Sequence, residues 1–380
     1  MKRFGSLLAL IAGLTACSSE QAMPVFHADT NPETLSAWGQ VTINSGALDL
    51  SEGVMPYELN TPLFSDYAHK LRTVWMPDGT KATYREGEVL DFPVGTVITK
   101  TFYYDTPGGP LDGLVLKSAT SEGLPDNQLG LENVRLIETR VLARRESGWI
   151  ALPYVWNDEQ TDAVLQRTGE IKRLTLVKDD ALEDATEFAY LVPDVNQCAG
   201  CHATNATTRA IQPIGPKARH LNGAFAYDTG TENQLAHWQT AGILAGAPAP
   251  HMAPRNAVWT DTSESIDRRA RAYLDANCAH CHNTVGAADT SGLHLEPDDP
   301  YGPNLGICKT PIAAGTGTGG RHFDIVPGDP DASIFTYRMA STNPAEMMPE
   351  LGRSLAHDEG VELIVEWIES LEGGGCLSDL

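Results

Sequence analysis

The sequence predicts an α+β protein of several domains, in which an N-terminal antiparallel β sandwich or jelly-roll-like domain precedes two mainly α domains. With 380 residues, and about 150 residues per domain, two or three domains are expected. Residues 36–195 alternate between β-branched or aromatic segments and Gly/Pro turns, which is typical of antiparallel sheets. Apolar residues at helical spacing occur only in the second half of the chain.

The composition excludes some classes of partner. Lys and Arg number 27 against 50 Asp and Glu, so the net charge is −23. Nucleic-acid binding requires clustered cations, and this balance argues against it and against a polybasic membrane-surface protein. The only long apolar run lies at the N-terminus, so no internal transmembrane helix is expected.

Residues 1–16 predict an export signal. Two cations, Lys2 and Arg3, precede a short apolar core at 7–14, and LTAC at 14–17 resembles a bacterial lipobox. Cys17 would then be lipidated, and residues 17–35 would form a polar tether. The alternative is a plain secretory signal in which Cys17 is incidental. Ser18 follows the cysteine, and the resemblance implies the periplasmic face or the surface of the outer membrane.

The segment 36–195 is predicted to be the β-rich domain, without a long helix. Residues 133–145 alternate well, and the turn at 146–148 leads into 149–156, as in a hairpin. Further strands are expected at 71–76, 81–85, 96–105, 114–117 and 171–177.

Two C-x-x-C-H motifs carry the strongest chemical signal. They are CAGCH at 198–202 and CAHCH at 278–282. Such a motif is the attachment site for c-type haem, in which two thiols add across the vinyl groups and the next His coordinates iron. We therefore predict two covalent haems, bound through Cys198, Cys201, Cys278 and Cys281, with His202 and His282 as proximal ligands.

Other uses of these cysteines explain the sequence less well. The 76 residues between the two pairs exceed the roughly 15–20 of zinc ribbons. Neither a thioredoxin-like motif nor a pair of structural disulfides requires a His directly after the second Cys. Cys308 and Cys376 remain, and in an exported protein we expect them to form a disulfide.

Residues 263–380 are expected to form the second haem domain. A helical stripe at 265–277 leads directly into Cys278, and a second stripe covers 361–371. This arrangement, over 264–372, resembles the class I cytochrome c fold, in which two such helices pack on the haem. The first haem region, 196–262, resembles a truncated cytochrome domain, because Pro193 leaves little helix before Cys198 and a helix-like stretch follows only at 232–244.

The distal ligand of the second haem is predicted to be Met348. It precedes Pro349 and lies between the motif and the closing helix, as in cytochrome c, and a thioether raises the haem potential. It could instead be a core residue. The remaining candidates are Met347, Met339, His294 and His322.

The distal ligand of the first haem is ambiguous. His220 is the one classical ligand between His202 and the helix at 232. An open position is also allowed, and so are ligands from nearby segments: His251, Met252, His69 and Met76. A six-coordinate iron only passes electrons, whereas an open position can bind a small molecule.

Several stretches resemble a poorly characterised family of exported di-haem c-type cytochrome lipoproteins. They are PLFSDYA at 62–68, DFPVGT at 91–96, LIETR at 136–140, WNDEQTD at 156–162, PIGPK at 213–217 and VPGDPD at 326–331. The resemblance implies an N-terminal β-rich domain, two haems, and a parallel β-helix protein as a partner.

We expect an electron carrier between periplasmic or cell-surface redox partners, and not an enzyme. Its acidic charge favours basic partner proteins. One alternative is a di-haem peroxidase. The other is a β domain that binds a carbohydrate or partner protein, in which Trp38, Trp75, Trp149 and Trp156 could stack on a sugar, although such residues usually fill a core.

Overall fold

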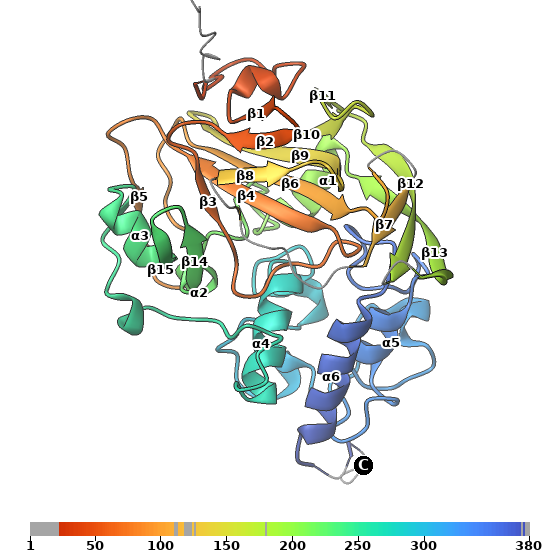
Figure 1. Ribbon diagram of the computed structural model, residues 1–380. Coiled ribbons are helices and arrows are strands. Elements are labelled where there is room, and N and C mark those ends of the chain that lie inside the picture. Colours follow the sequence, from red (N-terminus) through yellow and green to blue (C-terminus); the bar gives the residue numbers. More distant parts are fainter. Residues whose placement is uncertain are drawn as a thin grey trace, which may run out of the picture.

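A computed structural model describes residues 23–109, 113–117, 124, 127–178, 181–373 and 375–376. The predicted signal and lipidation site, residues 1–17, lie outside these ranges. Figure 1 shows a β-rich part above a smaller part that carries the helices α4, α5 and α6. Within the described residues, none of the helices combines the length and apolar character needed to cross a bilayer.

A six-stranded antiparallel sheet forms the centre of the β-rich part (Figure 1). In spatial order its strands are β11 (Ala163–Leu165), β10 (Gly148–Trp156), β9 (Val134–Arg145), β6 (Val97–Asp105), β4 (His69–Trp75) and β3 (Met55–Tyr57). This order follows the chain, so the sheet is a meander. The jelly-roll alternative is wrong here, because a jelly roll requires Greek-key crossovers.

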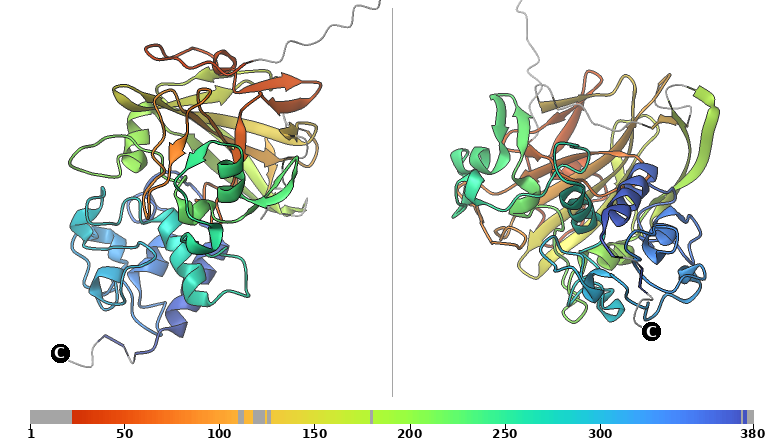
Figure 2. Two further views of the ribbon diagram at one scale, coloured as in Figure 1. Left: turned by 90° about the vertical axis from the view of Figure 1, so that its left-hand side faces the viewer. Right: turned by 90° about the horizontal axis from the view of Figure 1, so that it is seen from below.

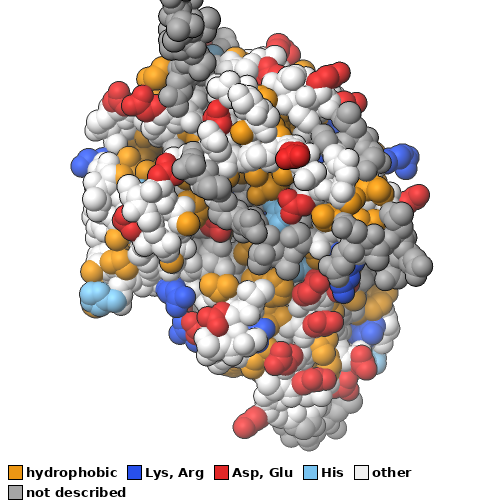
Figure 3. Space-filling model, in the orientation of Figure 1, with side chains coloured by type: hydrophobic (Ala, Val, Ile, Leu, Met, Phe, Trp, Pro, Cys, Tyr) orange, Lys and Arg blue, Asp and Glu red, His pale blue; other side chains and the backbone are white. Residues whose placement is uncertain are grey.

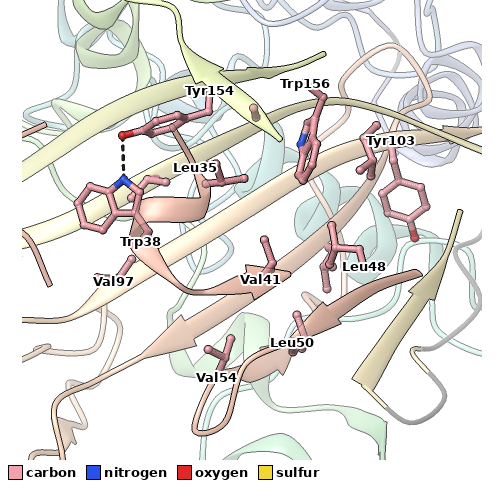
Figure 4. Packing of buried hydrophobic residues seen from close by; sticks show 14 of the residues in the cluster. Leu35, Trp38, Val41, Leu48, Leu50, Val54, Val97, Tyr103, Tyr154 and Trp156 are labelled. Carbon is pink, nitrogen blue, oxygen red and sulfur yellow. Dashed lines mark hydrogen bonds between the residues drawn. The ribbon is translucent and has the colours of Figure 1, made fainter. Parts of the chain in front are cut away.

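One face of the central sheet is covered by a small antiparallel sheet, in agreement with a sandwich. It consists of β1 (Val41–Asn44), β2 (Ala47–Leu50) and β8 (Gln128–Gly130), preceded by the 3₁₀ turn η1 (Ser36–Trp38). The core between the two layers includes Trp38, whose indole N–H donates to the hydroxyl of Tyr154 at 2.8 Å (Figure 4). Trp156 is 3 % exposed in the same cluster.

The opposite face of the central sheet packs against two different elements. At one end lies a third sheet of β13 (Ala181–Val192), β12 (Glu170–Lys178) and β7 (Leu114–Leu116), in which β7 runs parallel to β12. At the other end lie the short helices α2 (Ala218–Leu221) and α3 (Gln234–Thr240). An apolar cluster fills each of these two contacts. The stretch of this sheet face between the two clusters is not apolar.

The segment expected as the first haem region shares the core of the β-rich part. Trp238 of α3 is fully buried in a cluster with Val74, Ile98 and Leu142 of the central sheet. The strand β16 (Leu244–Ala245) pairs in parallel with β5 (Ala82–Thr83). The segment also contains the hairpin β14 (Ala224–Tyr227) and β15 (Gly230–Asn233) and the turn η3 (Pro250–Met252), so it is mixed and not mainly α.

The C-terminal part has its own core, built around two helices that were expected from the sequence. α4 (Ile266–Asn277) and α6 (Asp358–Ser370) pack against each other through Tyr273, Leu274, Ile364 and Trp367. α5 (Ile334–Ala340) and the 3₁₀ turns η4 (Asp289–Ser291), η5 (Pro303–Leu305) and η6 (Gly315–Thr318) complete it. The left view of Figure 2 shows these helices below the sheets.

The expected local elements are largely confirmed. Every strand expected from residues 71–177 is present, with bounds shifted by a few residues. The short strands β1, β2, β3, β8 and β11 and the long strand β13 were not expected. The four Trp residues that could have stacked on a sugar belong to the apolar clusters, with Trp75 and Trp149 partly buried at their edges.

Candidate functional site

The first C-x-x-C-H motif lies on the helix α1 (Val195–His202). Asp194 begins this helix, since its carboxylate accepts from the backbone N–H groups of Asn196 and Gln197 while Gln197 caps Asp194 in return. Residues three and four apart share one helix face. The helix therefore places Cys198, Cys201 and His202 together.

The second motif follows α4 without a break. Cys278 ends the helix, and the N–H groups of Cys281 and His282 both donate to the carbonyl of Cys278, at 3.0 and 2.9 Å. This tight turn keeps the helical spacing beyond the helix end. Both motifs thus present two thiols and one imidazole in the same local arrangement.

Both histidines are held in the tautomer that metal binding needs. Nδ1 of His202 lies 2.8 Å from the carbonyl oxygen of Gln212, which can only accept, so Nδ1 carries the proton. Nδ1 of His282 lies 3.1 Å from Oγ of Ser291, whose own proton is donated to the carbonyl of Ala288. In each case Nε2 keeps a free lone pair, and the hydrogen bond on Nδ1 fixes the ring orientation.

The surroundings keep both imidazoles neutral. Burial lowers the pKa of His202 to about 3, with further lowering by the charges of Lys100 and Arg140. Burial lowers the pKa of His282 to about 4. A neutral imidazole is the form that ligates iron.

The four motif cysteines carry free thiols, none of them bonded to another. Burial raises the pKa of Cys278 and of Cys281 to about 12, and it also raises the pKa of Cys198 and Cys201. A thioredoxin-like cysteine has a lowered pKa. The environment of these thiols therefore differs from that of a dithiol exchange site.

The fold brings the two motifs into contact. Sγ of Cys281 lies 3.8 Å from the carbonyl oxygen of Gly200, and the N–H of Ala206 donates to the carbonyl of Val285 at 2.7 Å. The contact joins residues 81 apart in the chain. In the described part of the chain, no three His, Cys, Asp or Glu side chains are arranged to bind a bare metal ion.

No known family model matches the chain, and no curated protein or solved structure shows significant similarity to it.

Met348 lies in a loop next to both motifs. The loop residue Glu350 acts electrostatically on Cys281, and Leu351 would be 3.1 Å from a Cβ added at Gly200. Arg353, 4 % exposed, holds the loop by donating from Nη2 to the carbonyls of Arg338, Ser341 and Met348. Met348 is half-buried, whereas its neighbour Met347 is buried.

The other candidates for the second haem differ in placement. Met339 packs at the edge of the C-terminal apolar cluster, and His322 is exposed. The backbone of His294 donates to Asn304, and its side chain is half-buried. Met348 remains our prediction for this ligand.

His220 belongs to a buried polar network between α2 and α4. Its Nε2 lies 3.2 Å from the carboxylate of Asp275, which also accepts two bonds from Arg219 and one from Asn256. Nδ1 of His220 is buried without a hydrogen-bond partner among the described residues. Burial lowers the pKa of His220 to about 4, so the ring is neutral. An unpartnered, neutral imidazole nitrogen is compatible with ligation.

The alternatives to His220 lie in less suitable places. Met252 is 71 % exposed and His251 is also exposed. Met76 is buried in the apolar cluster beneath α3, and Nε2 of His69 is 3.2 Å from Asp105. His220 therefore stays the prediction for the first haem.

Cys308 and Cys376 form a disulfide, as predicted. It ties the segment after α6 to the residue that follows Ile307, and Ile307 forms a β-bridge with Ile325. Sequence reasoning did not find the residues that orient the site, namely Gln212, Ser291 and Arg353. Their roles depend on contacts across nine or more residues or on backbone carbonyls, which leave no sequence motif.

Proposed function

We propose that this chain is a di-haem c-type cytochrome that carries electrons between periplasmic or cell-surface redox proteins. The observation that carries the proposal is the contact between two C-x-x-C-H motifs, Cys281 to Gly200, in a fold where both motif histidines keep Nε2 free. Four thiols stay free while the other two described cysteines pair, which supports their use in thioether bonds.

The donor set fits c-type haem. Cys198 and Cys201 would hold one group and Cys278 and Cys281 the other, with His202 and His282 as axial ligands. Bound haem would supply a one-electron iron couple. The chain's residues orient the ligands through Gln212 and Ser291 and bury the motifs, and these factors set a haem potential. The neighbouring motifs support direct electron passage between the two groups.

A cytochrome c-like architecture is part of the proposal for residues 263–380. It is supported by the packing of α4 against α6 and by the motif that begins where α4 ends. For residues 196–262 the likeness is limited to the motif, because α2 and α3 complete the core of the β-rich part.

The acidic surface supports a basic redox partner. Acidic side chains gather on the lower part of the face in Figure 3, where α6 lies. Exposed acids follow one another along this helix: Asp358, Glu362, Glu366 and Glu369. Complementary charge accelerates association and makes its rate fall with salt. By family resemblance we further propose lipid anchoring at Cys17, an outer-membrane location and a parallel β-helix partner.

Haem content tests the proposal directly. The chain, exported with its own signal in cells that mature c-type cytochromes and purified as a Cys17→Ser variant, should contain two covalent haems. The Cys198→Ser/Cys201→Ser and Cys278→Ser/Cys281→Ser variants should each retain one. Absence of covalent haem from the exported chain would overturn the proposal.

Carbon monoxide separates electron transfer from catalysis. If neither reduced haem changes its spectrum with carbon monoxide, both irons are six-coordinate and the relay function stands. If one haem binds it readily, that iron has an exchangeable site. Turnover of peroxide by the protein would then support a peroxidase function in place of the electron relay.

A further inference from the structure

A row of cations crosses the central sheet opposite the first motif. Strand pairing places Arg72 of β4 beside Lys100 of β6, and Lys100 beside Arg140 of β9. Directly paired residues of neighbouring strands point to the same face of a sheet. The three side chains therefore stand next to one another on the face that carries Phe102.

This cationic row borders apolar residues on one side and a mixed rung on the other. On one side, the next residues on this face are Val74, Ile98 and Leu142, which belong to the cluster under α3. On the other side Phe102, which packs with the third sheet, is flanked by Lys70 and Glu138. Like charges directly opposite one another destabilise a sheet, and a buried cation is costly without a partner. Only 27 cations occur in a chain with 50 acids, so their concentration here requires an explanation.

Among the described residues, the carboxylates that act on Arg72 and Lys100 are Glu58 and Glu138, so two carboxylates face the three cations of the row. Glu138 is fully buried, bonds to Arg140 through both oxygens and accepts from the hydroxyl of Tyr190. The ammonium of Lys100 has no hydrogen bond or ion pair within the described ranges, and its close contact is the ring of Phe102 at 5.0 Å from the centroid. Burial and the two neighbouring guanidinium groups lower the pKa of Lys100 to about 7.

The row faces the first motif. The helix α1, which carries the motif, packs against β10, and β10 is the strand next to β9 with its Arg140. In agreement with this placement, the charges of Arg140 and Lys100 act on Cys201 and on His202. A group attached at Cys198 and Cys201 would therefore lie near the row. Haem carries two propionate carboxylates, which are the kind of anion that an Arg and Lys row recognises.

We propose that the row Arg72–Lys100–Arg140 binds the propionates of the first haem, with Lys100, which forms no ion pair among the described residues, at its centre. This inference rests on the proposed function. The contacts would give the first haem a positive electrostatic environment, and positive charge favours the reduced iron. The β-rich domain would thus be half of the first haem site and not a separate module.

The Lys100→Gln variant tests this assignment, because it removes the charge and keeps a hydrogen-bond donor. Thioether bonds should retain both haems, so haem content stays at two. One potential, assigned by comparison with the Cys278→Ser/Cys281→Ser variant, should fall, and the propionate bending band in its resonance Raman spectrum should shift. The Lys100→Arg variant should restore both the potential and the propionate band. The matched control is Lys172→Gln on β12, whose ammonium pairs with Glu170, and it should change neither.

Two results would overturn the inference while leaving the proposed function intact. The first is a Lys100→Gln protein with two haems and an unchanged potential and propionate band. The second is a first-haem potential that changes when acetate is added to the unmodified protein at constant ionic strength. A free anion would then occupy the row in place of the propionates. A chain without haem would instead refute the proposed function.

Discussion

The thiol of Cys281 lies 3.8 Å from the carbonyl oxygen of Gly200, so the second motif touches the residue between the two cysteines of the first. Gly200 has no side chain, and a Cβ there would lie 3.1 Å from Cδ1 of Leu351. The loop that carries Met348 thus closes over the junction between the motifs. One small region of the molecule therefore contains both motifs and the predicted distal ligand.

Replacing Met348 with Ala should remove the long-wavelength methionine–iron charge-transfer band and lower the potential of the second haem, because a thioether ligand favours ferrous iron. Optical spectra and a redox titration would measure both effects. Met347→Ala is the matched control. It should keep the band and cost about 2–5 kcal/mol of stability, since Met347 is 6 % exposed. If only the Met347→Ala variant lost the band, Met347 would be the iron ligand and Met348 would not.

Removing the disulfide should destabilise the C-terminal part. Cys308 and Cys376 close a loop of 68 residues, for which chain entropy gives about 4 kcal/mol. Thermal unfolding of Cys308→Ser, Cys376→Ser and the double variant should give one common decrease in melting temperature, because either change breaks the same bond. A larger loss in the double variant than in both singles would show that the thiols act separately.

The ion pair between Arg219 and Asp275 joins α2 to α4. Both side chains are buried, and Asp275 accepts two bonds from the guanidinium group at 2.7 and 2.8 Å. Asp275→Asn should cost about 3–5 kcal/mol at pH 7, because it leaves the buried Arg219 with only the more distant, half-exposed carboxylate of Glu296 at 3.9 Å. Urea unfolding would measure the loss, and the joint change Arg219→Met/Asp275→Leu should recover part of it. Equal losses in the single and the joint variants would mean that the charge pair is not the cause.

The same pair predicts an acid limb in the stability profile. Although burial opposes it, hydrogen bonds from Arg219 and the nearby positive charges hold the pKa of Asp275 below its usual value. Its contribution is therefore complete above the unfolded pKa of about 3.9 and is lost as the pH falls below that value. Asp275→Asn should lack this limb.

His357 should make stability fall under mildly acidic conditions. Its ring stacks on Phe64 with centroids 4.3 Å apart, and Nδ1 accepts from the hydroxyl of Tyr273 at 2.9 Å. Burial lowers its pKa to about 4, so the stabilisation is complete above pH 6.5 and is lost as the pH falls toward 4.

Between pH 7 and pH 5 the loss attributable to His357 should be about 2 kcal/mol. It is measured as the difference in urea unfolding between the unmodified chain and His357→Gln. His251→Gln, at an exposed position, is the control and should follow the unmodified chain. A His357→Gln protein with the original pH dependence would assign the effect to other histidines.

The sequence alone predicted haem attachment, which stays a prediction, and it determined most of the local elements. Cys198, Cys201 and His202 lie within about one helical turn, so their grouping on one face can be predicted from five consecutive residues. The same holds for α4 and α6, whose apolar stripes follow the helical period, and for β9 and β10, whose turn is local. The disulfide followed from counting cysteines in a chain that was predicted to be exported.

Only the tertiary structure decided how these parts meet. The pairing of Arg72 with Lys100 and of Lys100 with Arg140 depends on strand register between residues 28 and 40 positions apart, and register is not encoded in any one strand. The contact of Cys281 with Gly200 and the network around Asp275 likewise join distant segments. Local spacing sets which residues can share a face, whereas long-range packing sets which faces are opposed, and the opposed faces create the site.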